Sequence, residues 1–187
     1  MAASGFKFFW TTHKWVGIIA AVVFLNIGVT GFLLLIKKQV PWIQPPEQKG
    51  SATYELTADF DAILESIRVV PEAGIQSWKD VDRLDVRPKK GILKVVPLNN
   101  RWEIQVDLRT AQVLQVEYRR SDLIEQLHDG SFYGSWVHGW VMPAIAFCLL
   151  YLVFSGLYLW IEPALRRRKR RANPPPRPSP RPDPMSG

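Results

Sequence analysis

The sequence predicts a membrane α-helical hairpin: two transmembrane helices that flank a small α+β domain. The first observation is that residues 15–36 and 140–161 form two stretches of 22 residues without a formal charge. Each stretch rises about 33 Å as a helix, which is roughly the thickness of a bilayer's hydrocarbon core. The second observation is that residues 37–133 are rich in charge, with 14 Lys or Arg and 15 Asp or Glu. Their apolar pattern changes from helical to alternating, which is typical of a folded α+β unit.

The N-terminal span is expected to be an uncleaved anchor. Residues 1–14 form an interfacial, cytoplasmic N-terminus in which Lys7 and Lys14 lie among aromatic residues. A cleaved signal peptide has an apolar region of about 7 to 15 residues and a small-residue cleavage site. The apolar run here is longer and leads into Lys37 and Lys38. Because lysines flank both ends, this helix does not orient itself.

The C-terminal span is followed by a basic block that sets the expected topology. The block consists of Arg166, Arg167, Arg168, Lys169, Arg170 and Arg171. Lys and Arg close to a transmembrane helix favour the cytoplasmic side. We therefore expect both termini to be cytoplasmic and the middle domain to lie on the far side of the membrane, which in a bacterium is the periplasm. Residues 162–187 are expected to form a disordered, basic and Pro-rich tail.

The charge distribution favours lipid as a partner over nucleic acid. The formal net charge of +7 comes mainly from the tail, because eight of the 24 Lys and Arg residues follow Glu162. A basic segment beside a membrane helix is typical of contact with anionic lipids. We therefore expect membrane lipids as partners and no nucleic acid.

The middle of the chain predicts a linker and then one small domain. Residues 37–51 contain three prolines and predict a stiff linker. In residues 52–120, a helix capped by Thr57 is expected to run for about four turns up to Pro71, followed by three or four antiparallel strands. One side of the sheet packs on the helix, so Glu103, Gln105 and Asp107 are expected to face water. Residues 121–139, with a short helix over 121–127, re-enter the membrane interface.

Three segments of the sequence resemble one family, the PepSY-associated transmembrane proteins. The first contains HKWVG at His13–Gly17 and N-x-G-x-T-G at Asn26–Gly31. The second is WEIQVDLRTAQVLQVEY at Trp102–Tyr118, which resembles the closing hairpin of a PepSY domain. The third contains LHDG at Leu127–Gly130 and SGLYLW at Ser155–Trp160. The resemblance covers about residues 8 to 162.

This resemblance implies a helix packed on an antiparallel sheet, an inner-membrane location and, in some members, haem b bound by histidines of the membrane helices. Two features depart from the family pattern. Ala111 stands where the PepSY hairpin usually has a turn glycine. The chain also has one pair of spans, whereas the siderophore-iron reductases of this family have two.

The three histidines, His13, His128 and His138, are the candidate haem ligands. Two neutral imidazoles on opposite sides of an iron hold haem b. His13 and His138 lie near opposite ends of the membrane, about 30 Å apart by helical rise. His128 and His138 would be about 15 Å apart on a continuous helix and can pair only if the helix breaks at Gly130 or Gly134. A second ligand from another copy or subunit is therefore the simplest arrangement.

The first span also carries small and polar residues suited to helix contacts. An amide at membrane depth needs a hydrogen-bond partner, which for Asn26 is a group in this chain or in another protein. The candidate helix-contact residues are Gly17, Asn26, Gly28, Thr30 and Gly31. Two functions follow from these features. The first is a non-catalytic accessory subunit that displays a PepSY-like module to a larger inner-membrane complex, with other subunits or a second copy as partners.

The second function is a haem-b-binding electron-transfer or ferric/metal-reductase component, active as a dimer or with a partner. Neither function needs an intrinsic hydrolytic site, and the sequence shows no G-x-S-x-G, H-E-x-x-H or P-loop motif. The single cysteine, Cys148, excludes an internal disulfide and a Cys-ligated cluster within this chain.

Overall fold

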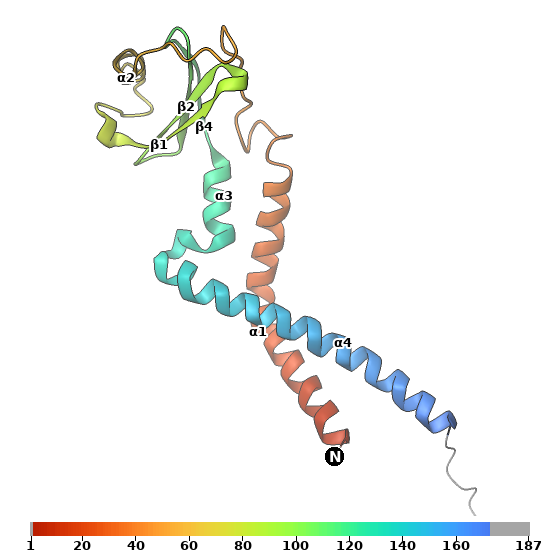
Figure 1. The fold of residues 1–187 in the computed structure, drawn as a ribbon. Coiled ribbons are helices and arrows are strands. Elements are labelled where there is room, and N and C mark those ends of the chain that lie inside the picture. The colour runs from red at the N-terminus through yellow and green to blue at the C-terminus, as the bar shows by residue number, and fades with distance from the viewer. Residues whose placement is uncertain (1, 173–187) are drawn as a thin grey trace, which may run out of the picture. The chain divides into compact units, whose positions relative to one another are not determined.

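A computed structural model describes residues 2–172 of the chain. It contains four α-helices and one four-stranded sheet within this range (Figure 1). The elements in chain order are α1 (Ala2–Leu35), α2 (Phe60–Arg68), β1 (Val81–Arg87), β2 (Ile92–Pro97), β3 (Trp102–Asp107), β4 (Val113–Tyr118), α3 (Arg120–Asp129) and α4 (Met142–Ala172). The chain divides into two compact units. One combines Met1–Phe24 with Trp140–Gly187, and the other is Leu25–Gly139.

Two helices are long and apolar enough to cross a membrane, which confirms the predicted pair of spans. They are Gly5–Leu35 and Val137–Ala172, and only 11% and 6% of their most apolar windows are buried. Large side chains such as Ile19, Val22 and Leu35 are more than three-quarters exposed. A helix that is apolar around most of its surface and exposed is stable only where lipid or another apolar partner surrounds it.

Both helices extend beyond the predicted limits. α1 begins at Ala2, so the segment expected as an interfacial terminus is helical from its second residue. α4 continues to Ala172 through Pro163, which corrects the prediction that disorder begins at residue 162. The residues after Glu162 are mostly Arg, Lys, Leu and Ala, all good helix formers. An ion pair between Glu162 and Arg166, 2.6 Å apart, spans the turn that contains the proline. The rest of the predicted disordered tail, 173–187, lies outside the described residues.

Within the first unit, α1 and α4 pack antiparallel. Phe9 lies against Tyr158, with ring centroids 4.9 Å apart, and Thr12 hydrogen-bonds Tyr151. Further along α1, a Cβ atom at Gly17 would lie 3.8 Å from Leu152. Phe9 thus meets a more C-terminal part of α4 than Thr12 and Gly17 do.

In the second unit, α2 covers one face of an antiparallel sheet with strand order β1-β2-β3-β4, which confirms the predicted α+β architecture (Figure 1). The core of this unit combines the inner side of α2 with alternate residues of the central strands. It includes Ile63, Leu64 and Ile67 of α2, Leu93 and Val95 of β2, and Ile104 and Val106 of β3. α2 is shorter than predicted because the N–H groups of Thr57 and Ala58 both bond Leu108 of the sheet region. The helix therefore starts at Phe60, with Asp59 at the N-cap.

The prediction that the second face of the sheet is open to water is wrong. Glu103, Gln105 and Asp107 are 1%, 0% and 2% exposed. The proline-containing linker crosses this face and bonds its side chains. Gln105 accepts the Gln48 N–H at 2.8 Å and donates to the Pro46 carbonyl at 3.0 Å. The linker therefore forms a third layer of the domain, over polar side chains that it satisfies.

Candidate functional site

Each of the three histidines uses its Nδ1 atom in a hydrogen bond to an oxygen. His13 bonds the Ser155 hydroxyl, His128 bonds the Thr30 hydroxyl, and His138 bonds the Asp129 carbonyl. The donor and acceptor roles in these bonds decide which ring nitrogen carries the proton. These roles follow from the other hydrogen bonds that each oxygen makes.

His13 lies against Ser155, a fully helical residue of α4 that is 3% exposed. The Ser155 Oγ donates its one proton to the carbonyl of Tyr151, at 2.7 Å, as serines in helices often do. The same Oγ lies 2.8 Å from His13 Nδ1 and can only accept there. His13 is therefore the Nδ1–H tautomer when neutral, and its Nε2 carries a free lone pair.

His128, at the C-terminal end of α3, is held by a hydroxyl in the same way as His13. Thr30 Oγ1 donates to the Asn26 carbonyl at 2.6 Å, four residues back along α1. It therefore accepts from His128 Nδ1–H, 3.0 Å away. Thr30 is 6% exposed, so water does not compete strongly for this hydroxyl. His128 also presents Nε2 with a free lone pair when neutral.

A glycine follows each hydroxyl residue and leaves room for the imidazole. A Cβ atom at Gly31 would lie 3.2 Å from His128 Cε1, and one at Gly156 would lie 3.3 Å from His13 Cε1. Both distances are tighter than ordinary contacts, so a larger residue would push the ring away. We call each pair, Thr30–Gly31 and Ser155–Gly156, a hydroxyl–glycine notch. The two notches hold two different histidines in the same way.

His138 is held by a break in the helix. α3 ends at Gly130 (φ 77°), Gly134 has φ 115°, and Val137–Val141 forms a π-helix. The two glycines thus interrupt the helix at the points that the sequence offered. His138 Nδ1 lies 2.9 Å from the Asp129 carbonyl, which can only accept, so Nε2 is again the free nitrogen of the neutral ring. Short π-helical segments occur frequently at functional sites.

Asp129 is stabilised as a carboxylate beside these histidines. Burial favours its neutral form, but the hydrogen bonds from Ser131 and the charges of His138 and His128 outweigh burial. The pKa of Asp129 is therefore held below its usual range. Its Oδ2 atom lies 3.7 Å from His138 Nδ1.

Asn26 finds its hydrogen-bond partner within the chain. Its Nδ2 donates to the Leu127 carbonyl at 2.9 Å. Leu127 lies in the last turn of α3, where the backbone carbonyls have no N–H partner inside the helix. Asn26, Thr30 and Gly31 thus form one face of α1 that holds the end of α3. A Cβ at Gly17 would lie 3.8 Å from Leu152, whereas a Cβ at Gly28 would meet no described atom within 4 Å.

The polar face of the sheet carries a buried ion network that was not predicted from the sequence. Lys94 Nζ lies 3.2 Å from both Glu47 and Glu103, and Glu103 also pairs with Arg119 at 3.1 Å. Arg119 pairs in turn with Asp122 at 2.9 Å. Lys94 is 3% exposed and Glu103 is 1% exposed. Alternating charges on neighbouring strands are the only sequence feature that could have suggested these pairs.

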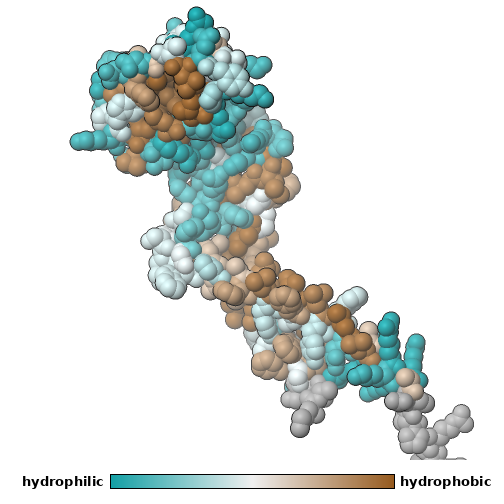
Figure 2. Space-filling view, viewed as in Figure 1, coloured by the Kyte–Doolittle hydropathy of each residue, from teal (hydrophilic) through white to brown (hydrophobic). Residues whose placement is uncertain are grey.

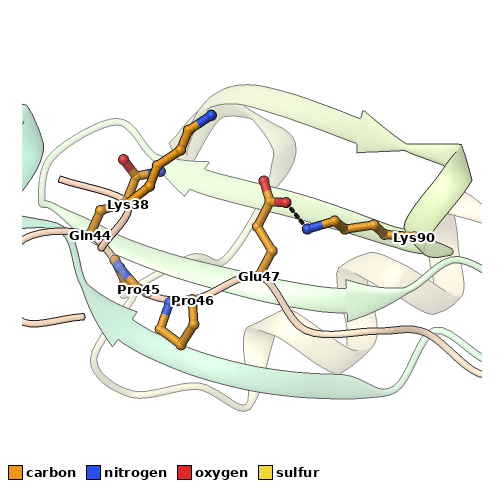
Figure 3. Close-up of a pocket in the computed structure, with 6 residues that line it drawn as sticks. All are labelled: Lys38, Gln44, Pro45, Pro46, Glu47 and Lys90. Atoms are coloured by element: carbon orange, nitrogen blue, oxygen red, sulfur yellow. Dashed lines mark hydrogen bonds and ion pairs between the residues drawn. The ribbon is translucent and has the colours of Figure 1, made fainter. Parts of the chain in front are cut away.

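A cavity of about 310 Å³ lies between the linker and the sheet (Figure 3). It is lined by Lys38, Gln44, Pro45, Pro46, Glu47 and Lys90. Figure 3 shows Glu47 pointing toward the Lys90 ammonium, with which it pairs. This hydrogen bond outweighs burial and, together with the charge of Lys94, lowers the pKa of Glu47 to about 2. The charges in this cavity therefore fix the linker to the sheet.

Among the described residues, no three His, Cys, Asp or Glu side chains are grouped closely enough to hold a metal ion by themselves. Ligation of a haem iron needs only one or two imidazoles, because the porphyrin supplies the other ligands. The Nδ1–H tautomer fits this role, since histidines that bind a metal through one nitrogen almost always donate from the other.

The family model described as PepSY-associated TM region matches residues 10–178. No curated protein and no solved structure matches the chain. The matched range includes α1 from residue 10 onward, the domain, α4 and all three histidines. The chain therefore belongs to the family of PepSY-associated transmembrane proteins.

Proposed function

We propose that this membrane protein is a haem-b-binding electron-transfer component of a bacterial cytoplasmic membrane, acting as a dimer or with a partner subunit. The observation that carries the proposal is the shared state of the three histidines. Each donates Nδ1–H to an oxygen of this chain and keeps Nε2 free. A haem b bound there would accept and pass on single electrons.

His13 and His128 are the proposed ligands, and the notch residues are positioning residues. Ser155 and Thr30 fix the tautomer and the ring orientation. Gly156 and Gly31 give the ring space to lie against the opposing helix. The same hydrogen bond also raises the basicity of the free nitrogen, which strengthens a bond to iron. The second axial ligand would come from a second copy or from a histidine of another subunit.

The proposed orientation rests on the basic block. Residues 166–171 are helical and follow the apolar part of α4 without a break. Six consecutive cations at this position favour the cytoplasmic side, so the domain between α1 and α4 would be periplasmic. A reporter fused after Gly187 should be active only in its cytoplasmic form, and one inserted near Asn99 only in its periplasmic form. The reverse pattern would refute this orientation.

An absorption spectrum tests the haem proposal. The full chain, purified in detergent from cells supplied with haem precursor, should show the sharp band of reduced haem b after addition of dithionite. His13→Ala should reduce the amount of bound haem. His138→Ala, purified in the same way, shows whether the third histidine also contributes to haem binding. Protein that is folded by circular dichroism but binds no haem, with or without the partner membrane fraction, would overturn the proposal.

A second function, display of the domain as an accessory subunit, is favoured by the linker. The segment directly after α1 is a layer of the sheet, and Ser121 at the start of α3 donates to the Ile43 carbonyl at 2.8 Å. The linker and the start of α3, at the two ends of the domain, are therefore joined to each other. Cross-linking of the domain in intact membranes should capture one defined partner at wild-type expression. If the chain stays a monomer that is cross-linked to no other protein, this would argue against the second function.

A further inference from the structure

The C-terminal end of α4 carries three arginines along one face. Residues three, four, seven and eight positions apart lie on the same side of a helix. This spacing aligns an indole ring, two small residues and three guanidinium groups. Together they line a cavity of about 450 Å³, and we call these residues the arginine face: Trp160, Pro163, Ala164, Arg167, Arg168 and Arg171.

No carboxylate of residues 2–172 pairs with the guanidinium groups of Arg167, Arg168 and Arg171. The ion pairs found among the described residues leave out Arg167, Arg168 and Arg171, and all three are exposed. The nearby Glu162 is already paired with Arg166, which also stacks over the Phe6 ring at 5.6 Å. The cavity therefore has three cations in its lining and no acidic residue. This lining suits an anionic ligand.

The other half of the cavity is apolar and continues into the membrane span. Trp160 is 78% exposed, and Pro163 and Ala164 are small enough to leave a hollow between the indole and the arginines. Figure 2 shows hydrophobic side chains along α4 that give way to hydrophilic ones at its C-terminal end. Trp is preferred at the boundary between lipid and water, where its ring is apolar and its N–H is polar. The ligand must therefore join a negative head to an apolar body.

We propose that the arginine face binds the phosphate headgroup of an anionic phospholipid, with the acyl chains along the apolar surface of α4 beyond Trp160. Guanidinium groups bind phosphate oxygens through two parallel hydrogen bonds. Such binding depends on where each arginine lies, whereas diffuse attraction depends only on the total charge. A soluble phosphate or a nucleic acid would use the arginines but not the adjoining apolar surface. This proposal is independent of haem binding.

Lipid binding by the full chain tests the proposal with a charge-matched pair of variants. Arg167→Gln/Arg171→Gln removes two cations that line the cavity. Lys169→Gln/Arg170→Gln removes two neighbouring cations that do not line it. Binding of phosphatidylglycerol is measured by native mass spectrometry in detergent, beside phosphatidylcholine and inorganic phosphate. Circular dichroism shows whether each variant stays helical.

The cavity variant should bind phosphatidylglycerol about thirty-fold more weakly than the wild type, from the usual contribution of two basic residues at an anionic membrane surface. The control variant should bind within about threefold of the wild type, since its cations lie off the arginine face. Trp160→Ala should weaken phosphatidylglycerol binding but leave the weak binding of inorganic phosphate unchanged. Equal losses in both double variants would overturn the proposal, because they would show only diffuse charge attraction. Equal binding of phosphatidylcholine, or inorganic phosphate competing as well as the lipid, would also overturn it.

Discussion

The buried pair of Lys94 and Glu103 allows a quantitative test of the polar side of the domain. The Nζ and Oε1 atoms are 3.2 Å apart, and Glu103 also accepts a hydrogen bond from Gln105 at 2.8 Å. Glu103→Gln keeps the shape of the side chain and removes its charge. Lys94 and Arg119 are then left with one carboxylate each, at Glu47 and Asp122.

The expected loss follows from the cost of leaving buried charge without its partner. Removing one partner of a buried ion pair costs about 3–5 kcal/mol. Glu103→Gln breaks the pairs with Lys94 and Arg119, but each of these cations keeps a second carboxylate, so we expect a loss near the lower end, about 3 kcal/mol. A domain of this size has a total stability of about 4–10 kcal/mol. The variant should therefore lose about 30% or more of the free energy of unfolding. Lys94→Met/Glu103→Leu, which removes both charges, should recover most of the loss because apolar replacements of buried pairs are often neutral.

Urea unfolding of the full chain in detergent, followed by the circular dichroism of the sheet, measures these differences. The surface pair Arg68–Glu65 is the control, because its side chains are 40% and 73% exposed. Glu65→Gln should change the free energy of unfolding by less than about 0.5 kcal/mol. If Glu103→Gln behaved like Glu65→Gln, or if the double variant were no better than the single one, the buried network would not stabilise the domain.

Three further changes test other parts of the structure. The folded-state pKa of Glu47 is about 2, below its ordinary 4.5, so the stability that Glu47 contributes is fully present above pH 4.5 and is lost as the pH falls toward 2. Glu47→Gln should flatten this part of an acid-unfolding curve. An unchanged curve would contradict the pairing of Glu47 with Lys90. Ala111 has φ 59°, a left-handed conformation that costs a non-glycine residue about 1–2 kcal/mol, whereas burial of its methyl group contributes about 0.8 kcal/mol. Ala111→Gly should therefore raise the thermal midpoint slightly. A lower midpoint would show that packing of the methyl group outweighs the backbone strain. Asn26→Leu removes the hydrogen bond to Leu127 and should lower stability in detergent by about 0.6–2 kcal/mol, while Gly28→Ala, at an open position, should have no measurable effect.

The parts of the fold that follow from local patterns could be predicted from the sequence. Two uncharged stretches identified the membrane helices, and alternation at Trp102, Ile104 and Val106 identified a strand that faces a helix. The same alternation suggested that Glu103, Gln105 and Asp107 meet water. Periodicity separates the apolar face from the polar one, but it does not reveal a distant segment that covers the polar face. The linker that buries them is more than 50 residues away in the chain.

The candidate site shows the same division. The histidines could be identified from residue type and position, and the i, i+4 spacing of Asn26 and Thr30 placed these two on one face. The hydroxyls that fix the imidazoles could not be assigned, because Thr30 and His128 are 98 residues apart and His13 and Ser155 are 142 residues apart. Helix ends were also missed: the Arg-rich segment was expected to be disordered from its composition, although Arg and Lys are good helix formers.

The claim that hydroxyl groups prepare His13 and His128 for iron is tested most directly by haem titration. The haem-free full chain in detergent is titrated with haem and followed by absorption. Ser155→Ala and Thr30→Val remove the acceptors, whereas Ser155→Thr and Thr30→Ser keep them. Each removal should weaken haem binding about 10- to 100-fold, the usual effect of losing a partner of a metal-ligating histidine, and the conservative variants should stay near wild type. Equal affinity in all five proteins, or no saturable binding by the wild type, would contradict the account.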